Sequence, residues 1–293
     1  MSFLSSLFSK KSKPALPKEE VQELDPKIRA ALVLMKTTDE GMAAVDLLKS
    51  QKLIADPHVP FNTCYNPEKQ SIYINTDMNP ADIAVRLAGA ARRIHHSQIL
   101  SEKDMVEMKA ADGVQCARVM EADVQAHEAL MFYYLKTNDK LPYAPFNPDS
   151  LGTMAALFSK CAGKTDQEAL SSAVGAYYND HRAVADCDMI YTRKQHSFAY
   201  DMTVRQQNKD IKPFSKDMPE KMFEKICSSR GVPYVKQESF NKTPFKIMSK
   251  CRRGDIARMV SAFSKDASIA AMPTFEEVNA RNAMVQKAVQ SHR

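Results

Sequence analysis

The sequence contains no tryptophan and only 8 glycines among its 293 residues. So few glycines argue against a collagen-like protein, a Gly-rich linker and an enzyme whose glycine loop cradles a nucleotide. No apolar run approaches the ~18–20 residues that a membrane-spanning helix needs. In other respects the composition is typical of a globular protein, with 44% hydrophobic and 26% charged residues. The length allows one large domain or two modest ones.

Cysteine pairs at short spacing are also absent. The chain has 6 cysteines, and the closest two are 24 residues apart in the sequence. No C-x-x-C motif exists, which excludes zinc ribbons and thioredoxin-type redox sites. We therefore expect free thiols in a reducing compartment and a cytoplasmic protein.

The formal net charge of +6 is unevenly distributed along the chain. Residues 1–20 carry a net charge of +2, residues 21–192 carry −6, residues 193–258 carry +9 and residues 259–293 carry +1. The change near residue 193 suggests a change of module or of surface role.

This distribution divides the chain into three parts. Residues 1–22 are expected to form a flexible, basic tail, residues 23–200 a folded domain, and residues 201–293 a basic helical region. The tail places an apolar helical face before Lys10 and Lys11, which is the wrong order for a secretory signal. It is suited either to contact a membrane surface or partner groove, or to stay disordered.

Helix signals dominate the folded part. Asp25-Pro26, Asn79-Pro80 and Thr165-Asp-Gln-Glu168 are typical of helix starts. The second of these predicts a long helix over about 80–98. A further helix is expected from Asp217-Met-Pro219 to Gly231, since glycine commonly ends helices.

One segment has the pattern of β structure. Residues 61–75 contain two short alternating runs around a turn, which predicts a single β-hairpin before the 80–98 helix. The expected fold class is therefore α+β and mostly α-helical.

Three motifs then follow one another in a recognisable order: Ile72-Tyr-Ile-Asn75, Leu87-Ala-Gly-Ala-Ala-Arg-Arg93 and Glu121-Ala-Asp-Val-Gln-Ala126. Together they resemble a bacterial, zincin-like family of unknown function whose members look like metallopeptidases. The resemblance covers about residues 25–200. It implies a metallopeptidase-like domain whose zinc helix is the one at about 80–98.

The zinc motif of that family is degenerate in this chain. In H-E-x-x-H helices, two histidines one turn apart hold the metal and the glutamate polarises the attacking water. By resemblance, Gly89 and Arg93 stand at the two ligand positions, and Ala90 stands at the position of the general base. Glu121 matches the expected third ligand. We therefore expect no catalytic residue and no cofactor, and a binding or scaffold protein with a protein partner.

Two arginines and two carboxylates are the expected binding residues. Arg92 and Asp123 match the arginine and aspartate of the family motifs. Arg93 is expected to replace the lost cation by forming a buried pair with Glu121, or else to point to solvent.

Two alternatives stay open. A metal-dependent hydrolase would need a zinc site rebuilt from His96, Glu121 and His127, whereas these histidines could equally make ordinary hydrogen bonds.

Binding of nucleic acid or an anionic surface is the other alternative, through residues 193–258. Its candidate contacts are Arg193, Lys194, Arg252 and Arg253. The competing interpretation is a solvated helical face that pairs with the acidic residues 21–192.

Overall fold

The computed structural model describes residues 24–59, 62–139, 141–145 and 157–291. The expected tail 1–22, with Lys10 and Lys11, lies outside these residues. The elements in chain order are α1 (Pro26–Met35), α2 (Asp39–Leu48), β1 (Lys52–Ala55), β2 (Thr63–Asn66), β3 (Ser71–Ile74), α3 (Pro80–Ile99), α4 (Glu102–Glu107), α5 (Ala110–Thr137), α7 (Asp166–Tyr177), α8 (His181–Tyr200), a π-helical turn (Asp201–Arg205), α9 (Met222–Ile226), β4 (Ser228–Ser229), β5 (Val232–Pro233), a 3-10 turn (Gln237–Asn241), α10 (Thr243–Lys246), α11 (Lys250–Ser261), a second 3-10 turn (Ser268–Ala271) and α12 (Phe275–Ser291). The chain is thus α+β and mostly helical, as predicted.

The predicted helix starts are confirmed by their caps. The Asp25 carboxylate accepts hydrogen bonds from the first amides of α1, and Asn79 caps α3 in the same way. Thr165 and Glu168 form a capping box at the start of α7. No helix of the described residues is long and apolar enough to cross a bilayer.

The predicted hairpin forms, but it belongs to a three-stranded sheet. β2 pairs antiparallel with β3, and β1 pairs parallel with the other edge of β3. The sequence did not predict β1, because four residues directly after a helix are too few to show alternation. The central strand buries Ile72 and Ile74 completely against α3.

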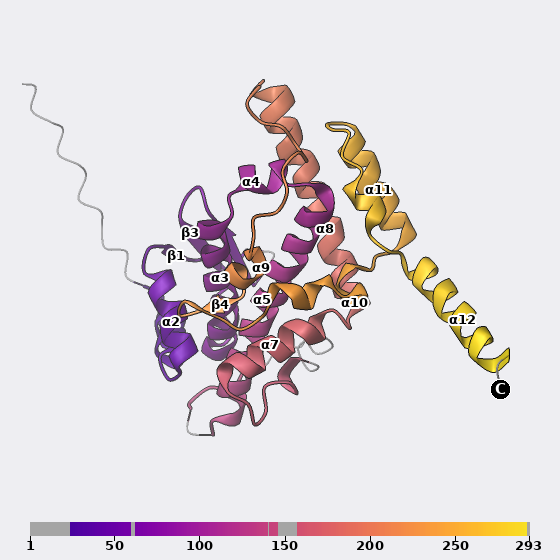
Figure 1. Cartoon of the computed structure of the whole chain (residues 1–293). Coiled ribbons are helices and arrows are strands. Elements are labelled where there is room, and N and C mark those ends of the chain that lie inside the picture. Colours follow the sequence, from indigo (N-terminus) through magenta and orange to yellow (C-terminus); the bar gives the residue numbers. More distant parts are fainter. Residues whose placement is uncertain (1–23, 60–61, 140, 146–156, 292–293) are drawn as a thin grey trace, which may run out of the picture.

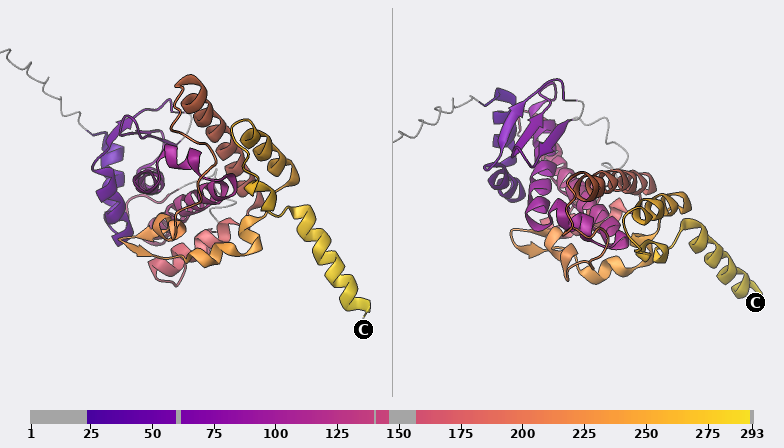
Figure 2. Two further views of the ribbon diagram at one scale, coloured as in Figure 1. Left: turned by 45° about the horizontal axis from the view of Figure 1, so that its top comes forward. Right: turned by 90° about the horizontal axis from the view of Figure 1, so that it is seen from above.

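Helices α3 and α5 lie side by side through the middle of the molecule (Figure 1). One side of α3 is covered by the sheet and by α1 and α2, while α5 also packs against α7, α8 and α9. Figure 2 shows the same arrangement from two further directions, with α12 projecting from the body. The contact between α3 and α5 brings the residues of the second and third sequence motifs together.

The described residues after 200 pack into hydrophobic clusters that they share with α5, α7 and α8. Phe223, Ile226 and Phe240 share one hydrophobic cluster with Leu130 of α5 and Tyr177 of α7. The change in charge near residue 193 is therefore not a boundary between separate cores.

The helix expected from Asp217 to Gly231 is much shorter. Only Met222–Ile226 are α-helical, and the chain then turns back in the two-residue hairpin of β4 and β5. Both turn residues, Arg230 and Gly231, have positive φ angles of 50° and 77°. Such a pair is what a type I′ turn requires, so the glycine shapes a hairpin turn and not a helix end.

Candidate functional site

A buried ionic cluster joins α3 to α5. Arg92 and His96 lie one turn apart on α3, and both approach the same carboxylate oxygen on α5. Asp123 Oδ2 accepts a hydrogen bond from Arg92 Nε at 2.8 Å and lies 2.7 Å from His96 Nε2. His127, one turn after Asp123, places its Nε2 3.8 Å from the other oxygen, Oδ1. That oxygen has no hydrogen-bond partner.

The same arginine ties a third segment to the cluster. Arg92 Nη2 donates to the carbonyl oxygen of Ile226, at the end of α9, over 2.8 Å. The side chains of Arg92 and Asp123 are only 6% and 0% exposed. Two opposite charges that are buried this deeply must compensate each other, because neither reaches water.

Burial and Arg92 fix the charge states in this cluster. Burial lowers the pKa of His96 and of His127, and the neighbouring guanidinium of Arg92 lowers both further. Burial alone would raise the pKa of Asp123, but Arg92 and the hydrogen bond from His96 outweigh it and lower that pKa. The cluster therefore holds one guanidinium, one carboxylate and neutral imidazoles near pH 7.

A cleft of about 390 Å³ opens beside this cluster, between α2 and the turn of the β4–β5 hairpin. Arg92 and His127 are among the residues that line the cleft. His127 Nε2 lies 3.2 Å from the hydroxyl of Tyr234, and its Nδ1 lies 3.9 Å from Glu40 Oε2. The cleft and the cluster thus share residues and form one site.

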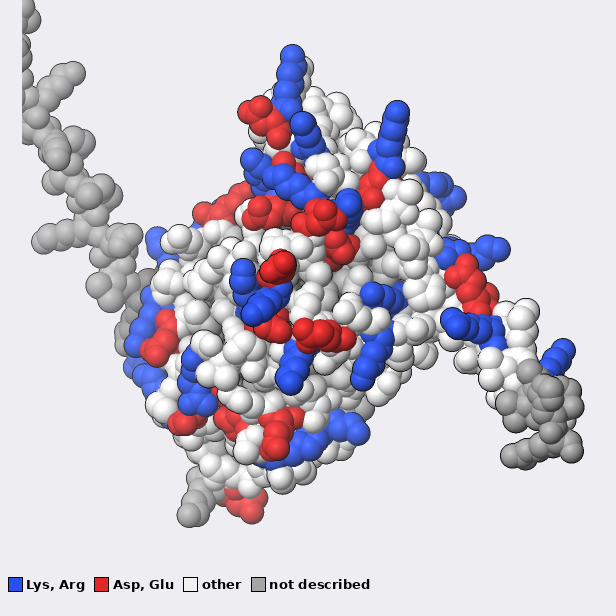
Figure 3. Space-filling view, in the orientation of Figure 1, with Lys and Arg blue, Asp and Glu red and all other residues white. Residues whose placement is uncertain are grey.

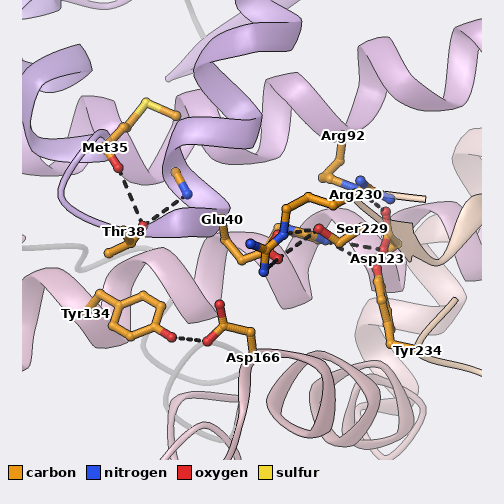
Figure 4. Close-up of polar contacts among 12 residues, drawn as sticks. Met35, Thr38, Glu40, Arg92, Asp123, Tyr134, Asp166, Ser229, Arg230 and Tyr234 are labelled. Atoms are coloured by element: carbon orange, nitrogen blue, oxygen red, sulfur yellow. Dashed lines mark hydrogen bonds and ion pairs between the residues drawn. The ribbon is translucent and has the colours of Figure 1, made fainter. Parts of the chain in front are cut away.

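Glu40 lines the cleft and lies beside Ser229 and Arg230 (Figure 4). Its side chain is 5% exposed. The Ser229 hydroxyl donates to the Glu40 carboxylate, with Oγ 2.8 Å from Oε1 and 2.6 Å from Oε2. Arg230 Nη2 lies 3.4 Å from Glu40 Oε1, and Arg230 Nη1 lies 3.2 Å from Asp39 Oδ2. Sequence reasoning missed these residues, because the hairpin joins positions about 190 residues apart. The only local signal was the Arg230-Gly231 dipeptide, which indicates a turn.

His95 also lines the cleft, but its hydrogen bond argues against a role as a general base. Burial and Arg92 lower the pKa of His95 to about 4, so the ring is neutral near pH 7. Its Nε2 lies 3.1 Å from the carbonyl oxygen of Lys225, which can only accept, so Nε2 carries the proton. The Ser228 hydroxyl lies 3.5 Å from the same nitrogen and donates to the same carbonyl. This arrangement does not activate a serine nucleophile.

The expected pair of Arg93 with Glu121 exists, but it is not buried. Arg93 Nη2 lies 3.0 Å from Glu121 Oε2, with the two side chains 48% and 27% exposed. Gln125 donates to the other oxygen of Glu121. Glu121 is partly buried, which opposes its ionisation, but Arg93 and Gln125 outweigh this effect and hold the pKa of the carboxyl below its ordinary value. The prediction that Arg93 is buried is therefore wrong, and the buried guanidinium is that of its neighbour Arg92.

The residues proposed for a rebuilt zinc site do not converge. Among the described residues, no three His, Cys, Asp or Glu side chains lie where they could hold one metal ion. Glu121 is engaged by Arg93, while His96 and His127 face Asp123. The donor set present does not fit a zinc ion, because a guanidinium already neutralises the buried carboxylate.

Gly89, at the first ligand position of the family motif, makes room for a carboxylate of α5. A Cβ atom at this position would lie 2.3 Å from Glu128 Oε1 and 2.9 Å from its Cδ. Glu128 itself is held by Arg86 Nη1 at 2.6 Å, with the two side chains only 11% and 16% exposed. Burial raises the pKa of Glu128, and Arg86 partly offsets this effect.

Replacing this glycine is expected to destabilise the protein. Gly89→Ala forces Glu128 away from Arg86, and overpacking of this kind costs about 1–3 kcal/mol of unfolding free energy. Gly175→Ala in α7 is the matched control, since its Cβ would meet nothing within 4 Å. Both variants gain about 0.5–1 kcal/mol from helix propensity, so Gly89→Ala should be less stable than Gly175→Ala by about the cost of overpacking. Urea denaturation measures the free energy of unfolding of both variants, and equal stability of the two would contradict this packing.

The basic candidates of residues 193–258 fall into two groups. Arg193 and Lys194 are exposed on α8. Arg253 forms two hydrogen bonds to Glu277 at 3.1 and 2.7 Å, and Arg252 lies 3.4 Å from Asp255. Figure 3 shows blue and red side chains interspersed over the face in view. Nucleic-acid or anionic-surface binding stays a prediction.

A second buried ion pair lies away from the cleft. Arg118 of α5 donates to both oxygens of Asp188 of α8, each over 2.7 Å, and also to the carbonyl oxygen of Phe245. No motif in the sequence singles out this arginine. Its position indicates a structural role, because the two side chains are 0% and 2% exposed.

Comparison with known proteins identifies no relative of this chain. No protein-family model, curated protein or solved structure matches it. The resemblance to zincin-like metallopeptidases therefore stays a prediction that rests on the three sequence motifs.

Proposed function

We propose that this chain is a metallopeptidase-like protein that binds a partner and does not hydrolyse peptide bonds with zinc. The observation that carries this proposal is that one oxygen atom, Asp123 Oδ2, contacts two side chains of α3. It serves both Arg92 and His96, so the buried carboxylate that lies between the candidate ligands His96 and His127 is already neutralised. A divalent cation placed there would also be repelled by the guanidinium of Arg92.

Two further features support binding over catalysis. The positions of the family's first ligand and general base are Gly89 and Ala90, and neither can ligate a metal or accept a proton. The cleft next to the cluster is large enough for part of a ligand, since binding sites start at about 300 Å³. We further propose a cytoplasmic location, which agrees with six free thiols.

Zinc loading tests the proposal directly. The full chain is equilibrated with zinc, dialysed, analysed for bound metal and incubated with a mixture of unstructured peptides. We expect no stoichiometric zinc, and mass spectrometry should detect no cleavage products.

One bound zinc per chain, with cleavage that a chelator abolishes, would overturn the proposal. The His96→Ala and His127→Ala variants separate this outcome from a contaminating protease. Cleavage that survives in both variants does not come from this site.

A further inference from the structure

The charge balance of the cleft between α2 and the β4–β5 turn favours a cation. Arg92 is neutralised by Asp123, and His95 and His127 are neutral near pH 7 for the reasons given above. Asp46 at the rim is engaged by Lys49 over 2.7 Å. Of the remaining acids, Glu40 lines the cleft, and Asp39, which precedes it in α2, contacts the cleft residue Arg230 from outside the lining.

A single cation, Arg230, serves both of these acids. Glu40 and its neighbour Asp39 together therefore exceed this cation by one negative charge. An anion would have to approach a buried carboxylate, whereas a cation would complete its pairing.

Arg230 occupies the position that such a ligand would take. Its guanidinium approaches Glu40 through one nitrogen at 3.4 Å, without the two parallel hydrogen bonds of an ideal arginine–carboxylate pair. The side chain is 50% exposed, so it can leave for water at a small cost in free energy. It is carried by the turn of a two-residue hairpin, at a residue with a φ angle of 50°.

The α2 wall of the cleft suits the stem of a long cationic side chain. Ala43, Ala44 and Leu47 of α2 line it, on the same helix that carries Glu40. Arginine and lysine cover apolar surface with their methylene groups while the charged end seeks an acid. The cleft therefore offers an anion and an apolar wall together.

We propose that this cleft binds an arginine or lysine side chain of a peptide segment from a partner protein, with Glu40 as the anion. Arg230 is then an internal competitor, which covers Glu40 until the ligand replaces it. This inference rests on the proposed binding function and adds the chemical class of the ligand. Glu40 and Arg230 must have opposite effects on affinity, which makes the inference testable.

Calorimetric titration of the full chain with blocked tripeptides tests it. The probe is acetyl-Gly-Arg-Gly-amide, and the matched control replaces arginine by citrulline, its neutral isostere. We expect binding of the arginine peptide and a loss of about tenfold or more in affinity for citrulline, the range for a charged hydrogen bond. Equal binding of the two peptides would overturn the proposal, as would preference for acetyl-Gly-Glu-Gly-amide.

Two variants give opposite expected results. Arg230→Ala removes the competitor and should tighten binding of the arginine peptide, whereas Glu40→Gln should weaken it by about tenfold or more. Asp217→Asn removes an acid that is 81% exposed and does not line the cleft, so it is the control and should change the affinity little. Weaker binding by Arg230→Ala would overturn the competitor role, and this variant stays informative even where Glu40→Gln does not fold.

The source of the cation and the proposed function are tested separately in the same titrations. n-Propylguanidinium carries the arginine side chain without a peptide backbone, so binding as tight as that of the tripeptide would overturn a peptide ligand. Mass spectrometry of the samples detects cleavage, which would overturn the non-hydrolytic function but not the ligand class. Absence of any binding would overturn this inference and leave the proposed lack of hydrolysis intact.

Discussion

Replacing Arg118 by leucine is expected to lower the free energy of unfolding by about 3–5 kcal/mol. The substitution leaves the carboxylate of Asp188, which is 2% exposed, without its two hydrogen bonds from the guanidinium. A buried charge without a partner keeps its full desolvation cost. At about 2–4 °C per kcal/mol for a chain of this size, the melting temperature should fall by roughly 6–20 °C.

A double variant separates the unpaired charge from loss of packing. Arg118→Leu together with Asp188→Leu removes both charges, so much of the lost stability should return. Arg258→Ala, whose side chain is 81% exposed beside Asp255, is the surface control and should cost less than about 1 kcal/mol. Chemical denaturation measures the free energy of unfolding of the wild type, Arg118→Leu, the double variant and Arg258→Ala. A single Arg118→Leu variant as stable as the surface control would contradict a structural role for this pair.

Two adjacent arginines of α3 should differ sharply in their effect on stability. Arg92→Ala is expected to cost about 3–5 kcal/mol, whereas Arg93→Ala should cost about 1 kcal/mol or less. Both arginines pair with a carboxylate of α5, but Arg92 is 6% and Arg93 is 48% exposed. Water solvates the partner left behind by Arg93 and cannot reach the one left behind by Arg92.

The loss of Arg92 should also loosen the segment that carries the cleft. Its hydrogen bond to the carbonyl oxygen of Ile226 holds the end of α9 just before the β4–β5 hairpin. Amide hydrogen exchange of residues 226–234 is therefore expected to rise in Arg92→Ala and to stay unchanged in Arg93→Ala. Equal destabilisation by the two substitutions would refute the difference in burial on which the site description rests.

The candidate site could be predicted only in part. The motifs of α3 and α5 brought out Arg92, Arg93, Glu121 and Asp123, and each of these pairs across the two helices. Helical spacing does not say which of two adjacent arginines is buried. Which arginine is buried depends on α9, which covers Arg92. No pattern in the sequence indicates that residues after 200 fold back onto α3.

Local signals in the sequence were sufficient for most of the secondary structure. Caps such as Asp25, Asn79 and Thr165 satisfy the first amides of a helix with nearby side chains, and the 61–75 hairpin is encoded by alternation around a turn. These interactions span a few residues, so the sequence alone determined them, together with the mostly helical α+β class. The resemblance to a degenerate zinc motif likewise rests on the sequence alone.

Only the tertiary structure decided what fills the place of that motif. The pairs of Arg92 with Asp123 and of Glu40 with Ser229 join residues 31 and 189 positions apart. Burial sets their strength and their charge states, and burial depends on every element packed around them. The cleft exists because the β4–β5 hairpin folds back over α2, and nothing local to either segment encodes that contact.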